Sequence, residues 1–279
     1  MTDTSQPLFL FGPGYCARAL AAIWHGPVHA FKRQPDADHK PKDVGTEPVP
    51  TPKRDQLRAE TCQSHILISA PPNRQGCPGL QILGEFVDEA ASVTYLSTTG
   101  VYGDLRGGWA FEDTPVAPRT ERAKLRVAAE RAWRDLYPNV RIVRLPGIYG
   151  PGRSALDRIS AGQARRVVKP GQVYSRAHVD DIAGGLKALM TSGHTGVFHL
   201  SDDEAAPPQD VTGFAADLLG VQPPPCIAIE AAGLSPMAKS FYGECKRVSN
   251  AKLKAATGWR PKYPSYREGL SAILDSENR

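Results

Sequence analysis

A glycine-rich turn close to the start of the chain constrains the fold more than any other stretch. An apolar run of strand length enters the turn, and a helical pattern follows at once. Gly12, Gly14 and Ala17 fit the G-x-G-x-x-G/A spacing of turns that bind dinucleotides. Gly12 permits the tight turn, Gly14 lets a diphosphate approach the backbone, and Ala17 lets the helix lie close to the strand. We expect these residues and Tyr15 to bind a dinucleotide at the helix N-terminus, although such a turn can also serve only as a turn.

The composition argues against several classes of protein. The chain has 279 residues and a formal net charge of +5, with no apolar run long enough to cross a membrane and no signal-peptide pattern at its N-terminus. Its five scattered cysteines lack a C-x-x-C pair, which favours reduced thiols in the cytoplasm over a disulfide framework or a metal site. The basic residues are spread out, so we expect an anionic small molecule as partner rather than nucleic acid or a membrane. Nucleic-acid binding is the alternative that the basic balance leaves open. The sequence also leaves a homodimer open.

The second predicted strand, 28–31, leads directly into Lys32 and Arg33. Its end lies about 20 residues past the glycine turn, where dinucleotide-binding folds contact the adenosine ribose. An acidic residue there binds the ribose 2′-hydroxyl of NAD, whereas an arginine accommodates the 2′-phosphate of NADP. The first acid, Asp36, comes later, so the sequence favours NADP; a solvated basic loop is the alternative.

Two further strands are predicted to end beside the glycine turn. A buried apolar run passes through Ala70 and stops at Pro71-Pro72, because proline cannot donate to a strand ladder, and this turn would lie against the cofactor. The next strand ends in a cluster of hydroxyl groups that includes Ser97 and Thr98. At the carboxyl end of a central parallel strand, such groups lie in the crevice where doubly wound sheets bind ligands. Otherwise the hydroxyls would only satisfy the turn that follows.

Several motifs in the same order are similar to those of the extended short-chain dehydrogenase/reductase superfamily, of the NAD-dependent epimerase/dehydratase type. The hydroxyl cluster and the Val-Tyr-Gly turn after it resemble the family signature S-S-x-x-V-Y-G. The stretches 141–152 and 173–183 resemble its R-x-x-x-Y-G-P-G and R-x-x-H-V-x-D segments, and 258–261 resembles its G-W-x-P segment. The resemblance therefore covers nearly the whole chain.

The resemblance implies roles for individual residues. The implied catalytic residues are Thr98, Lys124 and Tyr149. The cofactor would be bound by Ser97, Lys124 and Pro146, in addition to Gly12, Gly14, Tyr15, Ala17, Lys32, Arg33, Ala70, Pro71 and Pro72. The implied substrate-binding residues are Tyr102, Tyr149 and Arg176, of which Arg176 would face an anionic part of the substrate. For His178 we favour a structural role, and for Asp180 and Asp181 the capping of a helix.

The chain departs from the family pattern in the helix that should carry Y-x-x-x-K. Lys124 stands at the lysine position, but Thr120 stands four residues earlier, where the family has tyrosine. A threonine hydroxyl ionises far above the pKa of a phenol, so Thr120 can cap the helix but cannot act as a general base. The predicted apolar face of this helix contains Leu125, Ala128, Ala129 and Ala132. Lys124 itself could be one of several solvated charges.

We therefore expect an α/β protein with a Rossmann-type, doubly wound parallel sheet and a smaller C-terminal substrate domain. The dinucleotide-binding domain would span 1–150 with returning segments near 173–203, and the interleaved substrate-binding part would lie within 151–279. The resemblance implies an NAD(P)-binding, NADP-preferring oxidoreductase, epimerase or dehydratase acting by hydride transfer on a sugar-like or nucleotide-linked substrate. The alternative, prompted by Thr120, is a non-catalytic NADP-binding sensor or partner-binding protein.

Overall fold

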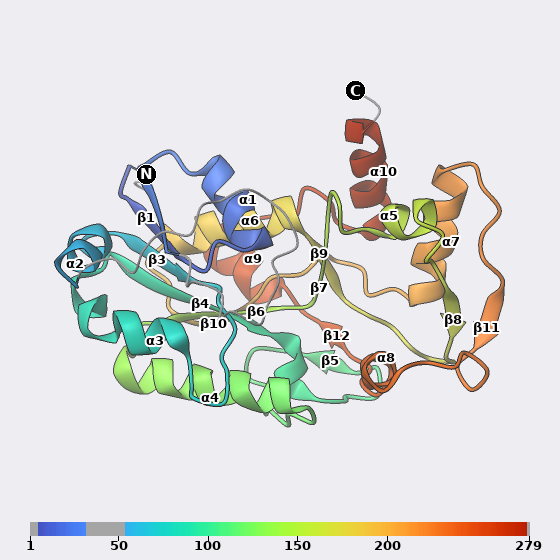
Figure 1. Ribbon diagram of the computed structural model, residues 1–279, viewed down its shortest axis with the longest axis horizontal. Helices are drawn as coiled ribbons and strands as arrows, with labels where there is room; N and C mark the ends of the chain where they lie inside the picture. The colour runs from blue at the N-terminus through green and yellow to red at the C-terminus, as the bar shows by residue number, and fades with distance from the viewer. Residues whose placement is uncertain (1–4, 32–53, 278–279) are drawn as a thin grey trace, which may run out of the picture.

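A six-stranded parallel sheet forms the centre of the computed structural model, which describes residues 5–31 and 54–277 (Figure 1). Within these residues the strand order is β10-β6-β4-β3-β1-β2. The strands are β1 (Leu8–Phe11), β2 (Val28–Phe31), β3 (His65–Ile68), β4 (Ser92–Thr98), β6 (Arg141–Leu145) and β10 (Gly196–His199). The chain places β2 on one side of β1 and β3 on the other, so the crevice at the switch point lies beyond the carboxyl ends of β1 and β3. This confirms the predicted Rossmann-type fold.

Alternating side chains divide the core into two layers, one on each face of the sheet. From β1, Leu8 and Leu10 pack with α1 and α6 on one face, whereas Phe9 and Phe11 pack with α3 and α4 on the other. Figure 1 shows the two sets of helices on opposite faces. The helices are α1 (Tyr15–Ile23), α3 (Pro78–Leu83), α4 (Glu121–Leu136), α6 (Val179–Met190) and α9 (Ala251–Thr257). Strands buried on both faces are typical of parallel sheets.

After the Pro71-Pro72 turn the residue pattern predicts a helix around 79–91, but the structure has two shorter elements there. The α-helix α3 begins at Pro78 and ends at Leu83, and a 3₁₀ helix, η1 (Gly84–Glu89), follows. Gly84 has a low α-helical propensity, and the tighter turns after it bury both Phe86 and Val87. The prediction of one continuous helix was therefore wrong.

Apart from α2, the remaining elements lie at or beyond the carboxyl edge of the sheet. A two-stranded ladder, β7 (Gly147–Tyr149) with β9 (Arg176–His178), lies there. Beyond it a third hydrophobic core joins residues of α5, α7 and α10, at the right of Figure 1. The remaining bounds are α2 (Arg54–Thr61), η2 (Thr99–Tyr102), β5 (Trp109–Ala110), α5 (Ala155–Ser160), β8 (Arg166–Val168), α7 (Pro208–Leu218), β11 (Cys226–Ala228), α8 (Pro236–Tyr242), β12 (Arg247–Val248) and α10 (Tyr266–Glu277). The domain boundaries given above stay a prediction.

Three further observations bear on the predicted class of protein. Among the described residues, no helix combines the length and apolarity needed to cross a membrane. The same residues contain no group of His, Cys, Asp or Glu side chains arranged to hold a metal ion. All five cysteines are free thiols. Lys32 and Arg33 lie outside the described residues, so the preference for NADP also stays a prediction.

Candidate active site

The backbone of Gly12 forms the tight turn after β1. Gly12 has φ +85°, and a Cβ built there would lie 2.9 Å from the backbone nitrogen of Ala70. Its N–H donates to the carbonyl of Phe31 over 2.9 Å, and the Ser69 hydroxyl donates to its carbonyl. The glycine is therefore required by the protein itself, because it joins the ends of β1, β2 and β3 at the crevice.

Gly14 stands at the N-cap of α1 and has no such internal reason to be glycine. Its φ is −78°, and a Cβ built there would come no nearer than 3.9 Å to any other atom of the described structure. No side chain caps the helix, so the N–H groups of its first turn are open to a ligand. Ala17 is fully buried against the sheet, as predicted. A glycine whose Cβ would meet only ordinary van der Waals contacts, standing before uncapped N–H groups, fits a diphosphate that approaches the backbone closely.

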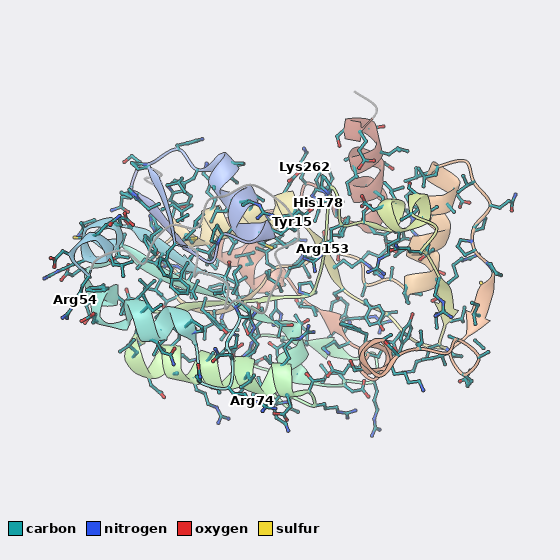
Figure 2. The ribbon with its side chains drawn as sticks, in the orientation of Figure 1. Tyr15, Arg54, Arg74, Arg153, His178 and Lys262 are labelled. Atoms are coloured by element: carbon teal, nitrogen blue, oxygen red, sulfur yellow. The ribbon has the colours of Figure 1, made fainter. Side chains whose placement is uncertain are left out.

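Tyr15 connects this turn to the loop after β7. Its hydroxyl donates to the carbonyl of Pro151 over 2.9 Å, and the Arg153 guanidinium lies 5.9 Å from its ring centre. Burial raises the pKa of Tyr15 to about 12, so the phenol is neutral at physiological pH. Figure 2 shows Tyr15, Arg153 and His178 gathered where α1 faces this loop. Sequence reasoning missed Arg153, whose only signal is its place directly after the Y-G-P-G motif.

The ends of β3, β4 and β6 carry the other predicted site residues to the same edge of the sheet. Ala70 follows β3 and donates its N–H to the carbonyl of Phe11 over 3.3 Å, and Pro71 and Pro72 come next. The Thr98 hydroxyl, at the end of β4, accepts from the N–H of Gly100 over 3.1 Å. Pro146 is half-buried between β6 and β7. Whether any of these residues binds a cofactor or a substrate stays a prediction.

The start of α4 agrees with the role that we predicted for Thr120. Its hydroxyl accepts from the N–H of Ala123 over 3.2 Å, which makes it the N-cap, and Glu121 stands in the first turn. Lys124 pairs with Glu121 over 2.8 Å, and its side chain is 55% exposed. Lys124, for which the resemblance implies contact with the cofactor, therefore points along the exposed side of its helix.

The face of α4 that meets the sheet differs from the predicted one. Ala128 and Ala132 are exposed. Trp133 is large and fully buried, so the side of α4 that carries it faces the sheet. The residues of α4 that are buried are Ala123, Val127, Ala129, Glu130 and Trp133. Beside this face Arg126 is half-buried, and its Nη1 donates to the carbonyl of Leu96 over 2.6 Å. The helix thus presents an arginine, rather than Lys124, to the sheet.

A buried polar network occupies the space under the hydroxyl cluster. Ser97 donates to Glu130 over 2.5 Å, and Arg144 binds Glu130 through two nitrogens, over 2.6 and 3.0 Å. Arg144 also donates over 2.6 Å to the Tyr102 hydroxyl, which lies 2.5 Å from Nε2 of His199. We expected Tyr102 in a loop beside the crevice, but it is fully buried and its hydroxyl has two protein partners. The structure gives Tyr102 a packing position, and contact with a substrate stays a prediction.

The other two predicted substrate residues are also held by the protein. The Tyr149 hydroxyl donates to the carbonyl of Ser265 over 3.3 Å, and burial raises its pKa well above that of a free phenol. It therefore cannot exchange protons easily near neutral pH. Arg176 donates through Nη1 to the carbonyls of Tyr174 and Ala206, over 2.7 and 3.0 Å, and burial lowers its pKa.

His178, and not an aspartate, caps α6. Its Nδ1 accepts from the N–H of Asp180 over 3.2 Å, and its ring lies between Tyr149 and Tyr263. Asp181 is buried and accepts from the backbone N–H groups of Lys262 and Tyr263, over 2.6 and 3.1 Å. The expected structural role of His178 agrees with these contacts. The expectation that Asp180 and Asp181 cap the helix was wrong, because His178 stands at the N-cap and the two aspartates follow it as the second and third residues of α6.

Comparison with known proteins finds both sequences and solved structures that are similar to this chain. No family model matches the chain. A structure of a functionally unknown conserved protein from Silicibacter pomeroyi is 39% identical, covers 97% of this chain and 99% of that one, and has a TM-score of 0.84. A 3-diazoavenalumate denitrifying reductase from a Streptomyces species is 32% identical over 140 residues, which are 46% of this chain and 45% of that reductase.

Two structures with bound cofactors have the same fold. The dTDP-glucose 4,6-dehydratase from Bacillus anthracis, in complex with NAD, is 16% identical with a TM-score of 0.75 and covers 98% of this chain and 96% of that one. The RMD protein from Pseudomonas aeruginosa, complexed with NADPH, is 20% identical with a TM-score of 0.69 and covers 97% and 98%. At these identities the likeness is one of fold.

Proposed function

We propose that the chain, which belongs to one family with the Silicibacter pomeroyi protein and has the fold of extended short-chain dehydrogenases/reductases, is an NAD(P)-dependent oxidoreductase of that superfamily. Gly14 is the observation that supports this most strongly. Its lack of a Cβ serves no internal contact, whereas a bound diphosphate would need it. The backbone from Gly12 to Cys16 would hold the diphosphate, and the ends of β3 and β4 would hold the nicotinamide half.

The bound cofactor would supply or accept the hydride at its nicotinamide ring. The chain's own part is to bind and orient the reactants. The Thr98 hydroxyl, at the end of β4, stands at the position of the catalytic hydroxyl that the resemblance implies. No described tyrosine stands on α4, and burial raises the pKa values of Tyr95, Tyr102 and Tyr149. We propose that the favoured reaction is reduction of an acceptor that needs no proton from a phenol. The similarity to a reductase agrees with this.

The substrate class is the less constrained part of the proposal. Arg176 and the third core lie beyond the crevice, where the family places its substrate, and a small anionic molecule would meet a basic side chain there. A sugar-like or nucleotide-linked substrate and a preference for NADP remain proposals from the sequence.

A second candidate function is a dinucleotide-binding sensor without catalysis. The observation in its favour is that Thr120 serves only as the N-cap of α4. Both functions need the cofactor, and they differ in turnover. Steady consumption of NADPH with a panel of carbonyl, imine and diazo compounds would reject the sensor, and binding without turnover across the panel would support it.

The experiment that tests the proposal is a calorimetric titration of the purified protein with NADPH and with NADH. We expect micromolar or tighter binding of at least one, and a loss of binding in a Gly14→Val variant, whose side chain would occupy the space of the diphosphate. Gly193→Val is the matched control, because a Cβ built on Gly193 would likewise meet no close contact, and this glycine lies far along the chain from the turn. Failure of the wild-type protein to bind either dinucleotide would overturn the proposal.

A further inference from the structure

Arg126 is the cation that α4 carries to the end of the central strands. Successive residues of an α-helix are about 100° apart, so Lys124 lies roughly 200° around the helix from Arg126. Lys124 is accordingly exposed, whereas Arg126 is half-buried beside the sheet-facing residues. Only one of the two side chains can reach the crevice from this helix.

The guanidinium of Arg126 lies where β4 continues past its neighbour. The pairing of β3 with β4 ends at Ile68, opposite Tyr95, whereas β4 continues to Thr98. Nη1 of Arg126 donates to the carbonyl of Leu96 over 2.6 Å and to the hydroxyl of Tyr95 over 3.0 Å. These two bonds fix the guanidinium over the carboxyl end of β4, next to the point where the pairing with the shorter β3 stops.

Among the described residues no carboxylate compensates the charge of this guanidinium, whose carbon lies 5.6 Å from the centre of the Tyr95 ring. Across residues 5–31 and 54–277, no carboxylate lies within 4.0 Å of Arg126, although Glu130 one turn later pairs with both Arg134 and Arg144. In the same part of the chain, its Nε and Nη2 groups have no hydrogen-bond partner. A half-buried cation with free donors at the end of a parallel strand fits an oxygen-rich ligand.

We propose that Arg126 binds the hydroxyl groups of the nicotinamide ribose and so takes the cofactor-binding role that the resemblance implies for Lys124. This inference rests on the proposed function, since it needs a dinucleotide in the crevice. An arginine stays charged at every physiological pH and offers donors in a rigid fork. Arg126 would therefore hold the cofactor, and the exposed Lys124 would not lower the pKa of a neighbouring acid in this site.

The test compares two ligands that differ by the terminal ribose. ADP carries the adenosine and the diphosphate, and ADP-ribose adds the ribose that Arg126 would contact. Titration calorimetry is run with both ligands on the wild-type protein and on Arg126→Gln, Arg126→Lys and Lys124→Gln. Loss of a charge-assisted hydrogen bond should weaken ADP-ribose about tenfold in Arg126→Gln and about threefold in Arg126→Lys. ADP affinity should stay unchanged in both, and Lys124→Gln should bind both ligands like the wild type.

The outcomes separate this inference from the function on which it rests. If the wild-type protein binds neither ligand, the proposed function itself fails. If the wild type binds both and Arg126→Gln does not discriminate between them, or if Lys124→Gln is the variant that weakens ADP-ribose, the role of Arg126 is overturned. Should Arg126→Gln fail to fold, Arg126→Lys keeps the charge and decides alone: unchanged ADP-ribose affinity there contradicts the inference.

Discussion

At the scale of single residues, the buried carboxyl of Asp202 predicts how stability depends on pH. It is 4% exposed, and its Oδ1 accepts from the N–H of Arg176 over 3.3 Å while Oδ2 has no partner among the described residues. Burial raises its pKa from 3.8 to about 8. Between pH 4 and pH 8 the folded protein thus holds a proton on Asp202 that the unfolded chain has released. The free energy of unfolding therefore falls as the pH rises from about 4 to about 8.

Asp202→Asn should therefore be more stable than the wild type at high pH and not at low pH. Asparagine keeps the acceptor for Arg176 without a charge to bury. We expect the difference in unfolding free energy to be near zero at pH 4, to grow to about 2 kcal/mol or more by pH 8, and then to level off. Urea unfolding at several pH values measures it, with the exposed Asp217→Asn as control. A difference that does not change with pH would contradict the assigned burial.

A second residue-scale prediction concerns the pair of Glu130 and Arg144. Their side chains are 1% and 3% exposed, and Arg144→Met would leave the carboxylate of Glu130 buried without its main partner. Breaking such a pair costs about 3–5 kcal/mol, whereas Arg54→Gln, which breaks the exposed pair with Glu85, should cost under about 1 kcal/mol. Urea unfolding at pH 7 compares the two variants. Equal losses would show that the buried network does not stabilise the fold.

At the scale of elements, the N-cap of α4 gives a test of what Thr120 does. Thr120→Ala removes the acceptor for the N–H of Ala123 and should lower the unfolding free energy by about 1 kcal/mol. Thr120→Ser keeps the acceptor and should change it little. Neither variant should alter the affinity for a dinucleotide, which titration of both proteins with NADPH would check. A large loss of affinity in Thr120→Ala alone would place this hydroxyl in the site.

The elements also show what could be predicted from the sequence. The strands of the sheet and the glycine turn were predictable because apolar runs and glycine spacing are local signals. The orientation of α4 was not predictable in the same way. The family spacing pointed to Lys124 as the residue that faces the cofactor, and the small side chains of the alanines do not show which side of the helix is buried. Trp133, the largest fully buried side chain among the described residues, sets that orientation. Its presence near the end of the helix was the feature of the sequence from which the buried side could have been predicted. Burial of Tyr102 depends on Arg144 and His199, which are distant in sequence.

At the scale of the whole molecule, the segment after α9 ties the C-terminal end to the sheet. Trp259 is 9% exposed and belongs to the same core as β1, α1 and α6, and a Cβ built on Gly185 would lie 3.3 Å from its ring. Asp181 of α6 accepts from two backbone N–H groups of the same segment, at Lys262 and Tyr263. The C-terminal residues are thus part of the core that positions the glycine turn.

Trp259→Ala should therefore destabilise the entire protein, and not the C-terminal part alone. Loss of a large buried ring costs about 3–5 kcal/mol, and the cavity would open directly against α6, which packs on α1. We expect one unfolding transition, shifted to lower urea, with far-UV and near-UV circular dichroism changing together. Arg260→Ala, at the exposed neighbouring position, is the control and should stay within about 0.5 kcal/mol of the wild type. Two separate transitions in Trp259→Ala would mean that the sheet and the C-terminal segment fold as independent units, and that the glycine turn does not depend on the end of the chain.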